Sequence, residues 1–510
     1  MSKNKQGLPA QRSAGTMLAA GVTLVLLVAC LAALLVVRPL PAWVDRAAQS
    51  SSALEQTVSQ RMVETYCPAR MSLADTSQYG DSEFQVSQGD VASSSRYSAF
   101  GAIYRSTVST LSGENSNDLK DSDPTDESAV HVMAGNADQG SLLQQTQLLE
   151  ASQGTGVASA TASWASQGDL RGLAATSCAD SSLTHAFLLP GTQTGWSQQI
   201  VVANSSSQAT SVSVQVWGTS QTGGLTLATS GSLTVNADGE TVYDLSAAAA
   251  NQDGLYVTLT SQRTPVHALV RVVAMNGLTA QGSDYVAETS EASQMIAIAG
   301  VKGVSSARVL LFADQNTSVS LSWITPNGLV AATSHDVTAS QVGVVDLGAP
   351  PADAVGVGVT ADQPVRASVV VTRNGDGGQS DFAVLSSGEQ SVYSAAAVPD
   401  QVEASLAVSN VTRADTSVTF DGYDADGRHV GAKDVTLGAN CAQTISLSDL
   451  GDNVAVVRLH DERQTVSWNV MLQRQSLADA GVGAVAAIGS TPLSVAHATI
   501  YANPRQGVVK

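Results

Sequence analysis

Aromatic and charged side chains are scarce in this chain of 510 residues, at 4% for Phe, Trp and Tyr and 14% for Asp, Glu, Lys and Arg. Small and β-branched residues dominate instead. This composition favours strands with small side chains and with Ser and Thr on one face over long helices rich in Leu, Glu and Lys. We therefore expect an all-β protein, and the length is enough for several domains of ordinary size.

The chain also lacks the short motifs that mark common active sites. It contains no Gly-x-Ser-x-Gly, no Ser-x-x-Lys, no phosphate-binding P-loop and no Gly-x-Gly-x-x-Gly unit between a strand and a helix. None of its seven histidines stands at the short spacing of paired zinc ligands. We expect a protein that is not an enzyme and that needs no cofactor or metal. An unrecognised hydrolase stays open, and carboxylates that face one cleft would favour it.

Positive charge is low relative to negative charge. The chain has 44 Asp and Glu against 25 Lys and Arg, a formal net charge of −19. Such a surface repels phosphate backbones and anionic lipid headgroups, so nucleic acid is excluded as a partner.

One long uncharged run stands out near the N-terminus. Residues 17–37 (MLAAGVTLVLLVACLAALLVV) would span, as a helix, roughly the 30 Å hydrocarbon core of a membrane. Lys3, Lys5 and Arg12 precede this run without any acid, so the positive-inside rule places residues 1–16 in the cytoplasm. We expect a single-pass protein of the cell membrane with its C-terminal ectodomain outside.

The chain has only four cysteines. Cys30 ends the sequence LVAC, which resembles the lipidation site of bacterial lipoproteins; lipidation there is an alternative to a plain membrane-embedded side chain. Cys67 opens the first folded region and Cys178 closes it, so an oxidising compartment would allow a disulfide between them. Cys441 is left as a small core residue or a free thiol.

Three later segments of about 100 residues each resemble one another, which is the size of an immunoglobulin-like unit. The matching stretches are 242–245 (VYDL), 344–347 (VVDL) and 444–447 (TISL), and 265–272 (PVHALVRV), 364–371 (PVRASVVV) and 465–472 (TVSWNVML). Apolar residues in them largely alternate with polar ones, as in strands with one buried face. We predict tandem immunoglobulin-like β-sandwich domains at 185–290, 291–390 and 391–500, followed by a tail over 501–510.

Within this alignment His267 takes the position of Arg366 and Ser467. It is therefore expected to point outward from its strand.

The region before these segments is less regular. Residues 67–184 are predicted to form a divergent, membrane-proximal β-domain, in which the acidic stretch 114–127 is a loop because it cannot bury enough apolar surface. Residues 38–66 form a stalk in this interpretation. Leu54, Val58 and Met62 stand at helical spacing there, which suggests a short helix within residues 42–66.

Three carboxylates in the last segment share the spacing of the first half of a calcium loop: Asp421, Asp424 and Asp426. No bidentate Glu follows at the required distance. The preceding segments have turn sequences at the same place, so a hairpin turn is preferred and calcium is the weaker alternative.

Several spaced motifs resemble an actinobacterial family of unknown function. They are residues 66–68 (YCP), 171–178 (RGLAATSC), 189–191 (LPG), 201–204 (VVAN), 277–284 (GLTAQGSD) and 298–301 (IAGV). The resemblance covers most of residues 67–500 and implies a single-pass, extracytoplasmic envelope protein. None of the motifs is catalytic.

We thus expect a non-catalytic binding or scaffolding module of the cell envelope, whose partner is a cell-wall polymer or an envelope protein. The alternative is an accessory subunit of a membrane complex for transport or envelope assembly.

Overall fold

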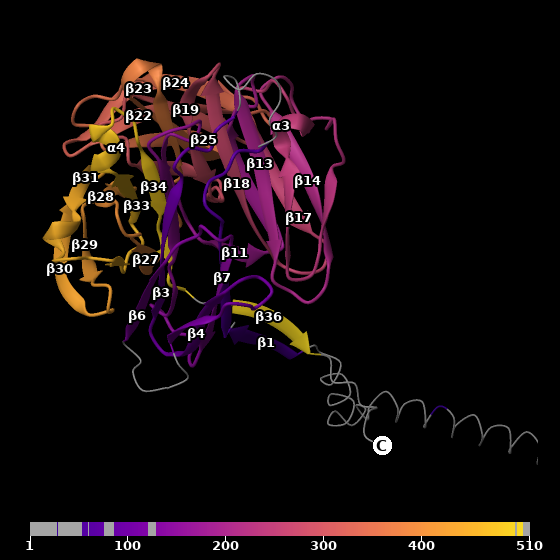
Figure 1. Ribbon diagram of the computed structural model, residues 1–510. Helices are drawn as coiled ribbons and strands as arrows, with labels where there is room; N and C mark the ends of the chain where they lie inside the picture. Colours follow the sequence, from indigo (N-terminus) through magenta and orange to yellow (C-terminus); the bar gives the residue numbers. More distant parts are fainter. Residues whose placement is uncertain are drawn as a thin grey trace, which may run out of the picture. The chain divides into compact units, whose positions relative to one another are not determined.

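Strands account for nearly all regular structure in the computed structural model, which describes Val28 and residues 54–59, 61–75, 86–120, 129–494 and 497–502. The prediction of an all-β protein is confirmed. The chain divides into two units: β1 (Leu54–Ser59) pairs antiparallel with β36 (His497–Ala502) in one, and residues 60–495 form the other, shown in Figure 1.

Among the described residues, no helix is both long and apolar enough to cross a membrane. The predicted span, residues 17–37, lies outside them apart from Val28.

The first segment of the larger unit has two antiparallel sheets, ordered β10-β9-β3-β6 (with β8 on β3) and β2-β7-β4-β5. Its strands are β2 (Met62–Cys67), β3 (Ala92–Phe100), β4 (Ile103–Ser109), β5 (Asn117–Lys120), β6 (Val130–Gly135), β7 (Leu142–Leu148), β8 (Gly156–Val157), β9 (Ala160–Ala165) and β10 (Gly172–Ser177).

Two expectations for this segment are wrong. Among the described residues of the predicted helix, 54–59 and 61–66, none is helical: Leu54 lies in β1 and Met62 begins β2, whose Thr65 and Tyr66 are buried. The acidic stretch is not a loop throughout, because residues 117–120 form β5 and pair with the edge of β4, where backbone bonding outweighs the poor packing of the side chains. Residues 121–128 lie outside the described part.

The second segment also buries a core between two sheets, β12-β17-β14-β15 and β16-β13-β18-β19. Val257 and Val270 lie in this core and are fully buried. The strands are β12 (Thr184–Pro190), β13 (Trp196–Asn204), β14 (Thr210–Gly218), β15 (Ser232–Val235), β16 (Gly239–Asp244), β17 (Gly254–Ser261), β18 (Val266–Asn276) and β19 (Thr279–Val286), with the helical turn α3 (Leu245–Ala248).

Residues 293–385 form the third segment, in which β25 (Gly356–Asn374) pairs with strands of both faces. Its other elements are β20 (Ser293–Ala299), β21 (Ser306–Phe312), β22 (Thr317–Thr325), β23 (Gly328–Val337), β24 (Gly343–Gly348), η2 (Asp376–Gly378) and β26 (Ser380–Leu385).

The fourth segment has the sheets β30-β29-β32-β27-β35 and β31-β28-β33-β34. Its elements are β27 (Tyr393–Ala397), β28 (Glu403–Asn410), β29 (Thr416–Tyr423), β30 (His429–Leu437), β31 (Ala442–Ser446), η3 (Leu447–Asp449), β32 (Val456–His460), β33 (Val466–Gln473), α4 (Gln475–Asp479), β34 (Ala486–Gly489) and β35 (Thr491–Pro492).

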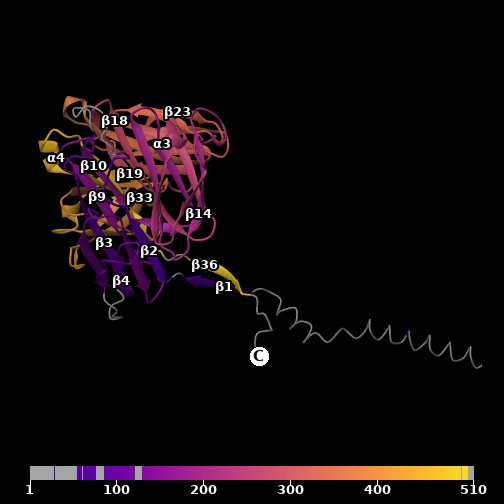
Figure 2. The same ribbon diagram turned by 45° about the vertical axis from the view of Figure 1, so that its right-hand side comes forward.

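The segments are not separated by free linkers. Strand β11 (Ala179–Ser182) pairs with β2 of the first segment and with β18 of the second. The core of the fourth segment extends onto Trp164 and Leu173 of the first, so violet and yellow strands lie side by side in Figures 1 and 2. The domain boundaries drawn from the sequence remain predictions.

One strand near the end of each segment packs against the corresponding strands of the others in the interior: β10, β19, β26 and β34, which we call the hub. Two buried carboxylates join these strands. Asp381 of β26 accepts backbone N–H bonds from Leu173 (2.8 Å), Ser283 (3.3 Å) and Val485 (3.0 Å). Asp284 of β19 accepts one from Val384 (2.8 Å) and a long one from Ala175 (3.5 Å).

Two glycines make room for Asp381. A Cβ on Gly172 or Gly282 would lie 2.6 or 2.4 Å from Asp381 Oδ1, and Gly282 has a φ of +105°. Any other residue at these positions would displace the carboxylate that joins the hub strands.

Candidate functional site

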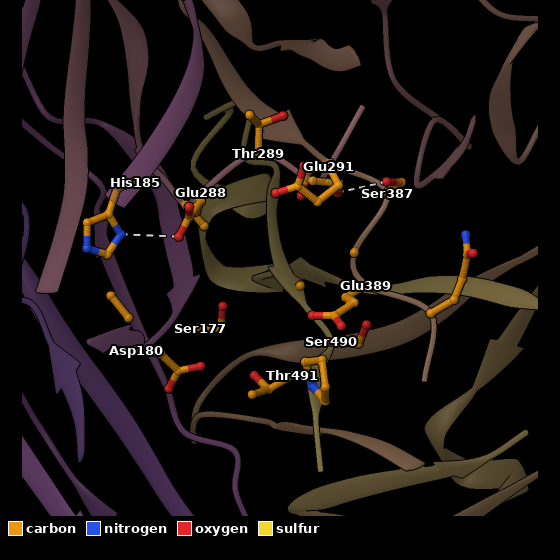
Figure 3. Close-up of a pocket in the computed structure, with 18 of the residues that line it drawn as sticks. Ser177, Asp180, His185, Glu288, Thr289, Glu291, Ser387, Glu389, Ser490 and Thr491 are labelled. Atoms are coloured by element: carbon orange, nitrogen blue, oxygen red, sulfur yellow. Dashed lines mark hydrogen bonds and ion pairs between the residues drawn. The ribbon is translucent and has the colours of Figure 1, made fainter. Parts of the chain in front are cut away.

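A cavity of about 670 Å³ lies where the chain leaves the hub strands. Residues that follow all four strands line it, among them Asp180 after β10, Glu288 after β19, Glu389 after β26 and Ser490 after β34. Figure 3 shows these side chains around one space. We call this cavity the hub pocket; no single segment could form it.

The lining is polar and acidic. It includes the carboxylates of Asp180, Glu288, Glu291 and Glu389, and none of its described residues is Lys or Arg. Within the described part of the chain, the carboxylates of Asp180 and Glu389 have no hydrogen-bond or ion-pair partner. The hub pocket therefore carries negative charge that the protein itself does not neutralise.

Glu288, by contrast, is held in place. Its Oε2 lies 3.2 Å from Nδ1 of the buried His185, and its Oε1 accepts a bond from the backbone N–H of Ala186 at 3.3 Å. His185 Nε2 lies 2.7 Å from the carbonyl oxygen of Val266. Both ring nitrogens of His185 thus lie within hydrogen-bond distance of oxygen atoms, which fixes the ring beside Glu288.

Asp180 is the carboxylate whose protonation the pocket alters. Water reaches it through the mouth of the pocket, yet protein surrounds the carboxylate, and this loss of solvation is the main cause that raises its pKa to about 6. The negative charges of Glu288 and Glu389 act in the same direction, and His185 opposes them.

Thr289 adds a neutral polar group to the wall of the pocket. Its backbone N–H donates to the carbonyl of Ala186 at 2.8 Å, which fixes the residue, and 6% of its surface is exposed. Its hydroxyl is buried without a hydrogen-bond partner. An unpaired buried hydroxyl is costly and calls for an explanation, such as a group that binds there.

The predicted disulfide pair is joined: Cys67 and Cys178 form a disulfide with their Cα atoms 4.4 Å apart. Cys178 also lines the hub pocket. The disulfide thus ties β2 to the wall of the pocket. Cys441 is a free, half-buried thiol, and Cys30 lies outside the described residues.

The three calcium candidates lie in and before the turn between β29 and β30. Asp424 accepts bonds from the backbone N–H groups of Asp426 and Arg428, both at 2.9 Å, which is the geometry of a hairpin turn. Asp421 pairs with Arg458 at 2.9 Å, and Asp426 pairs with Arg428. No three His, Cys, Asp or Glu side chains in the described ranges are grouped so as to hold a metal ion.

The hub pocket was not predicted from the sequence. Its carboxylates are far apart in the chain and become neighbours only when the four segments assemble. The one signal was positional: an acidic or hydroxyl residue follows each hub strand within a few residues.

These features define an all-β protein of several sheets with an acidic pocket and no recognised catalytic constellation among the described residues. In a comparison with protein-family models, residues 132–448 match a family of unknown function, DUF5719, and the chain belongs to this family. A comparison with curated proteins finds no match.

Proposed function

We propose that this protein is a non-catalytic binding module of the cell envelope, anchored in the membrane by residues 17–37 and displaying tandem immunoglobulin-like sandwich domains outside the cell. Its ligand is a cell-wall polymer or an envelope protein, and the hub pocket is where it binds. The observation that carries the proposal is the unneutralised charge of Asp180 and Glu389 in a cavity lined by all four segments.

The location is tested by fusing a reporter after Lys510. Lys3, Lys5 and Arg12 should keep the N-terminus inside, so the reporter should be active only outside the cytoplasm. Activity of the fusion in the cytoplasm would overturn this orientation.

The role of the pocket is tested by complementation of a deletion strain. The variant Asp180→Asn/Glu389→Gln should fail to restore the wild-type phenotype, since it removes the unpaired charges from exposed side chains that make no hydrogen bond or ion pair in the described part of the chain. The matched control is Asp353→Asn/Glu150→Gln, which changes two exposed carboxylates elsewhere. Full complementation by the pocket variant would refute the proposal.

One observation favours a hydrolase as the second candidate. Carboxylates face one pocket, and a raised pKa such as that of Asp180 suits a general acid. Incubation of the full-length protein with isolated cell-wall polysaccharide decides between the two. Release of reducing ends that is lost in Asp180→Asn would favour the hydrolase, and binding without release favours the binding module.

A further inference from the structure

The unpaired charges of the hub pocket indicate what kind of ligand it takes. Two negative carboxylates, Asp180 and Glu389, turn toward the space between them in Figure 3, and no basic side chain of the described lining compensates them. A cationic group on the ligand would gain two charge-assisted contacts. The pocket therefore favours a cation.

A single metal ion does not fit this arrangement. Calcium and magnesium need several oxygens converging on one point, and no such grouping of three acidic, His or Cys side chains occurs in the part of the chain that the structure describes. The charge is instead spread over a cavity of about 670 Å³, which suits an organic molecule.

The rest of the lining is rich in hydroxyl groups. Thr289 offers a buried hydroxyl without a partner, and Ser177, Ser490 and Thr491 also line the pocket. These groups can donate to or accept from a polyhydroxylated ligand, whereas the aliphatic stem of a lysine side chain would leave them unpaired.

A second cavity, of about 400 Å³, borders the first and shares His185, Glu288 and Glu291 with it. Its lining includes Trp217 and Tyr256, whose rings lie 5.4 Å apart between centroids. Trp217 is half-buried, so part of its ring is open to a ligand. An apolar ring beside hydroxyl and carboxylate groups matches a sugar, which has an apolar face and a polar edge.

We infer that the hub pocket binds an amino sugar within a polysaccharide chain, with its free ammonium group between Asp180 and Glu389, a hydroxyl on Thr289 and a neighbouring sugar ring against Trp217. This inference rests on the proposed function and specifies its ligand.

Isothermal titration of the full-length, detergent-solubilised protein at pH 6.5 tests the inference. The probes are a glucosamine tetramer, its N-acetylated counterpart, a short lysine-containing peptide and calcium chloride. The glucosamine tetramer should bind at least about tenfold more tightly than the N-acetylated one, because acetylation removes the charge. Binding should weaken as salt rises.

Two variants locate the contacts. Asp180→Asn/Glu389→Gln should weaken binding of the glucosamine tetramer by more than about tenfold, and Asp353→Asn/Glu150→Gln should leave it unchanged. Thr289→Val should weaken binding without lowering the melting temperature, because the hydroxyl has no partner in the free protein. Unchanged affinity in Thr289→Val would overturn the contact assigned to that residue.

The outcomes separate this inference from the proposed function. Preferential binding of the lysine peptide, of calcium or of the N-acetylated sugar would overturn the amino-sugar inference. If no probe binds but the double pocket variant still fails to complement the deletion strain, the inference falls and the proposed function stands. If the double variant complements fully, both fall.

Discussion

Substitution of Asp381 should destabilise the larger unit more than any other single substitution, because its carboxylate accepts backbone hydrogen bonds from the three other segments that contribute hub strands. Asp381→Ala leaves the buried N–H groups of Leu173, Ser283 and Val485 without acceptors. Each unpaired N–H group costs about 1 to 3 kcal/mol of stability. The variant no longer buries a carboxylate, and the desolvation cost that it thereby avoids offsets part of this loss. We expect the free energy of unfolding to fall by roughly 3 to 6 kcal/mol, a large share of the roughly 5 to 15 kcal/mol that is typical of folded proteins.

Urea unfolding of the full-length protein, followed by tryptophan fluorescence, measures this loss. Asp381→Asn keeps one acceptor oxygen and should cost less than Asp381→Ala, whereas Asp353→Ala, at an exposed position, should change stability by no more than about 0.5 kcal/mol. Hydrogen exchange then locates the damage. In Asp381→Ala the amides of β10, β19 and β34 should exchange faster, together with those of β26.

A loss of stability under about 1 kcal/mol in Asp381→Ala, no more than an ordinary single hydrogen bond contributes, would contradict this role of Asp381. Faster exchange confined to β26 would contradict it as well. In either case the three backbone donors would have found other partners, and the hub would not depend on this carboxylate.

Three further outcomes are expected. Removing the disulfide with Cys67→Ala/Cys178→Ala should lower the free energy of unfolding by about 4 to 5 kcal/mol in the chain-entropy model, since the cysteines are 111 residues apart, and urea titration measures it. Burial lowers the pKa of His267 to about 4, so the side chain stays neutral in the folded state while the unfolded state gains a proton below about pH 6.5. The free energy of unfolding should therefore fall by up to about 3 kcal/mol as the pH drops from 6.5 to 4. His267→Gln should flatten this fall in unfolding curves taken at pH 7 and 4.5, and an unchanged slope would show that other groups cause it. Val270→Asp puts an unpaired charge in a core and should cost several kcal/mol, whereas Val242→Asp on the exposed side of β16 should be nearly neutral by thermal melting.

Alternation along the chain predicted the strands of the later segments because each of those strands buries one face in a core of its own segment. Val270 and Val369, at matching positions, are both fully buried. The same rule did not predict the burial of His267. This side chain points away from its own core, as expected, but it is buried against the first segment, where Nδ1 lies 2.9 Å from the carbonyl of Ala179 and the ring stacks on Tyr66. Alternation reports the two faces of a strand and does not show what covers the outer one.

The N-terminal errors have a related cause. Leu54 and Met62 fit a helical period, but the chain between residues 54 and 67 forms β1 and β2 because partners far along the sequence pair with them: β36 with β1, and β7 and β11 with β2. A local sequence pattern does not show such partners, since the pairing energy comes from strands that are close only in the folded state.

The hub and its pocket depend on each other in a way that follows from their positions. Asp381 and Asp284 fix the strands of all four segments, and the pocket is lined by the residues that come directly after those strands. Burial raises the pKa of both aspartates well above the ordinary value, so holding them inside has a free-energy cost that an apolar pair would avoid. That cost is understandable if the carboxylates fix the positions of the strand ends, because Asp180, Glu288 and Glu389 can act on one ligand only while the four ends stay in register. A ligand held there would in turn stabilise the assembled unit, since the unfolded chain has no such pocket.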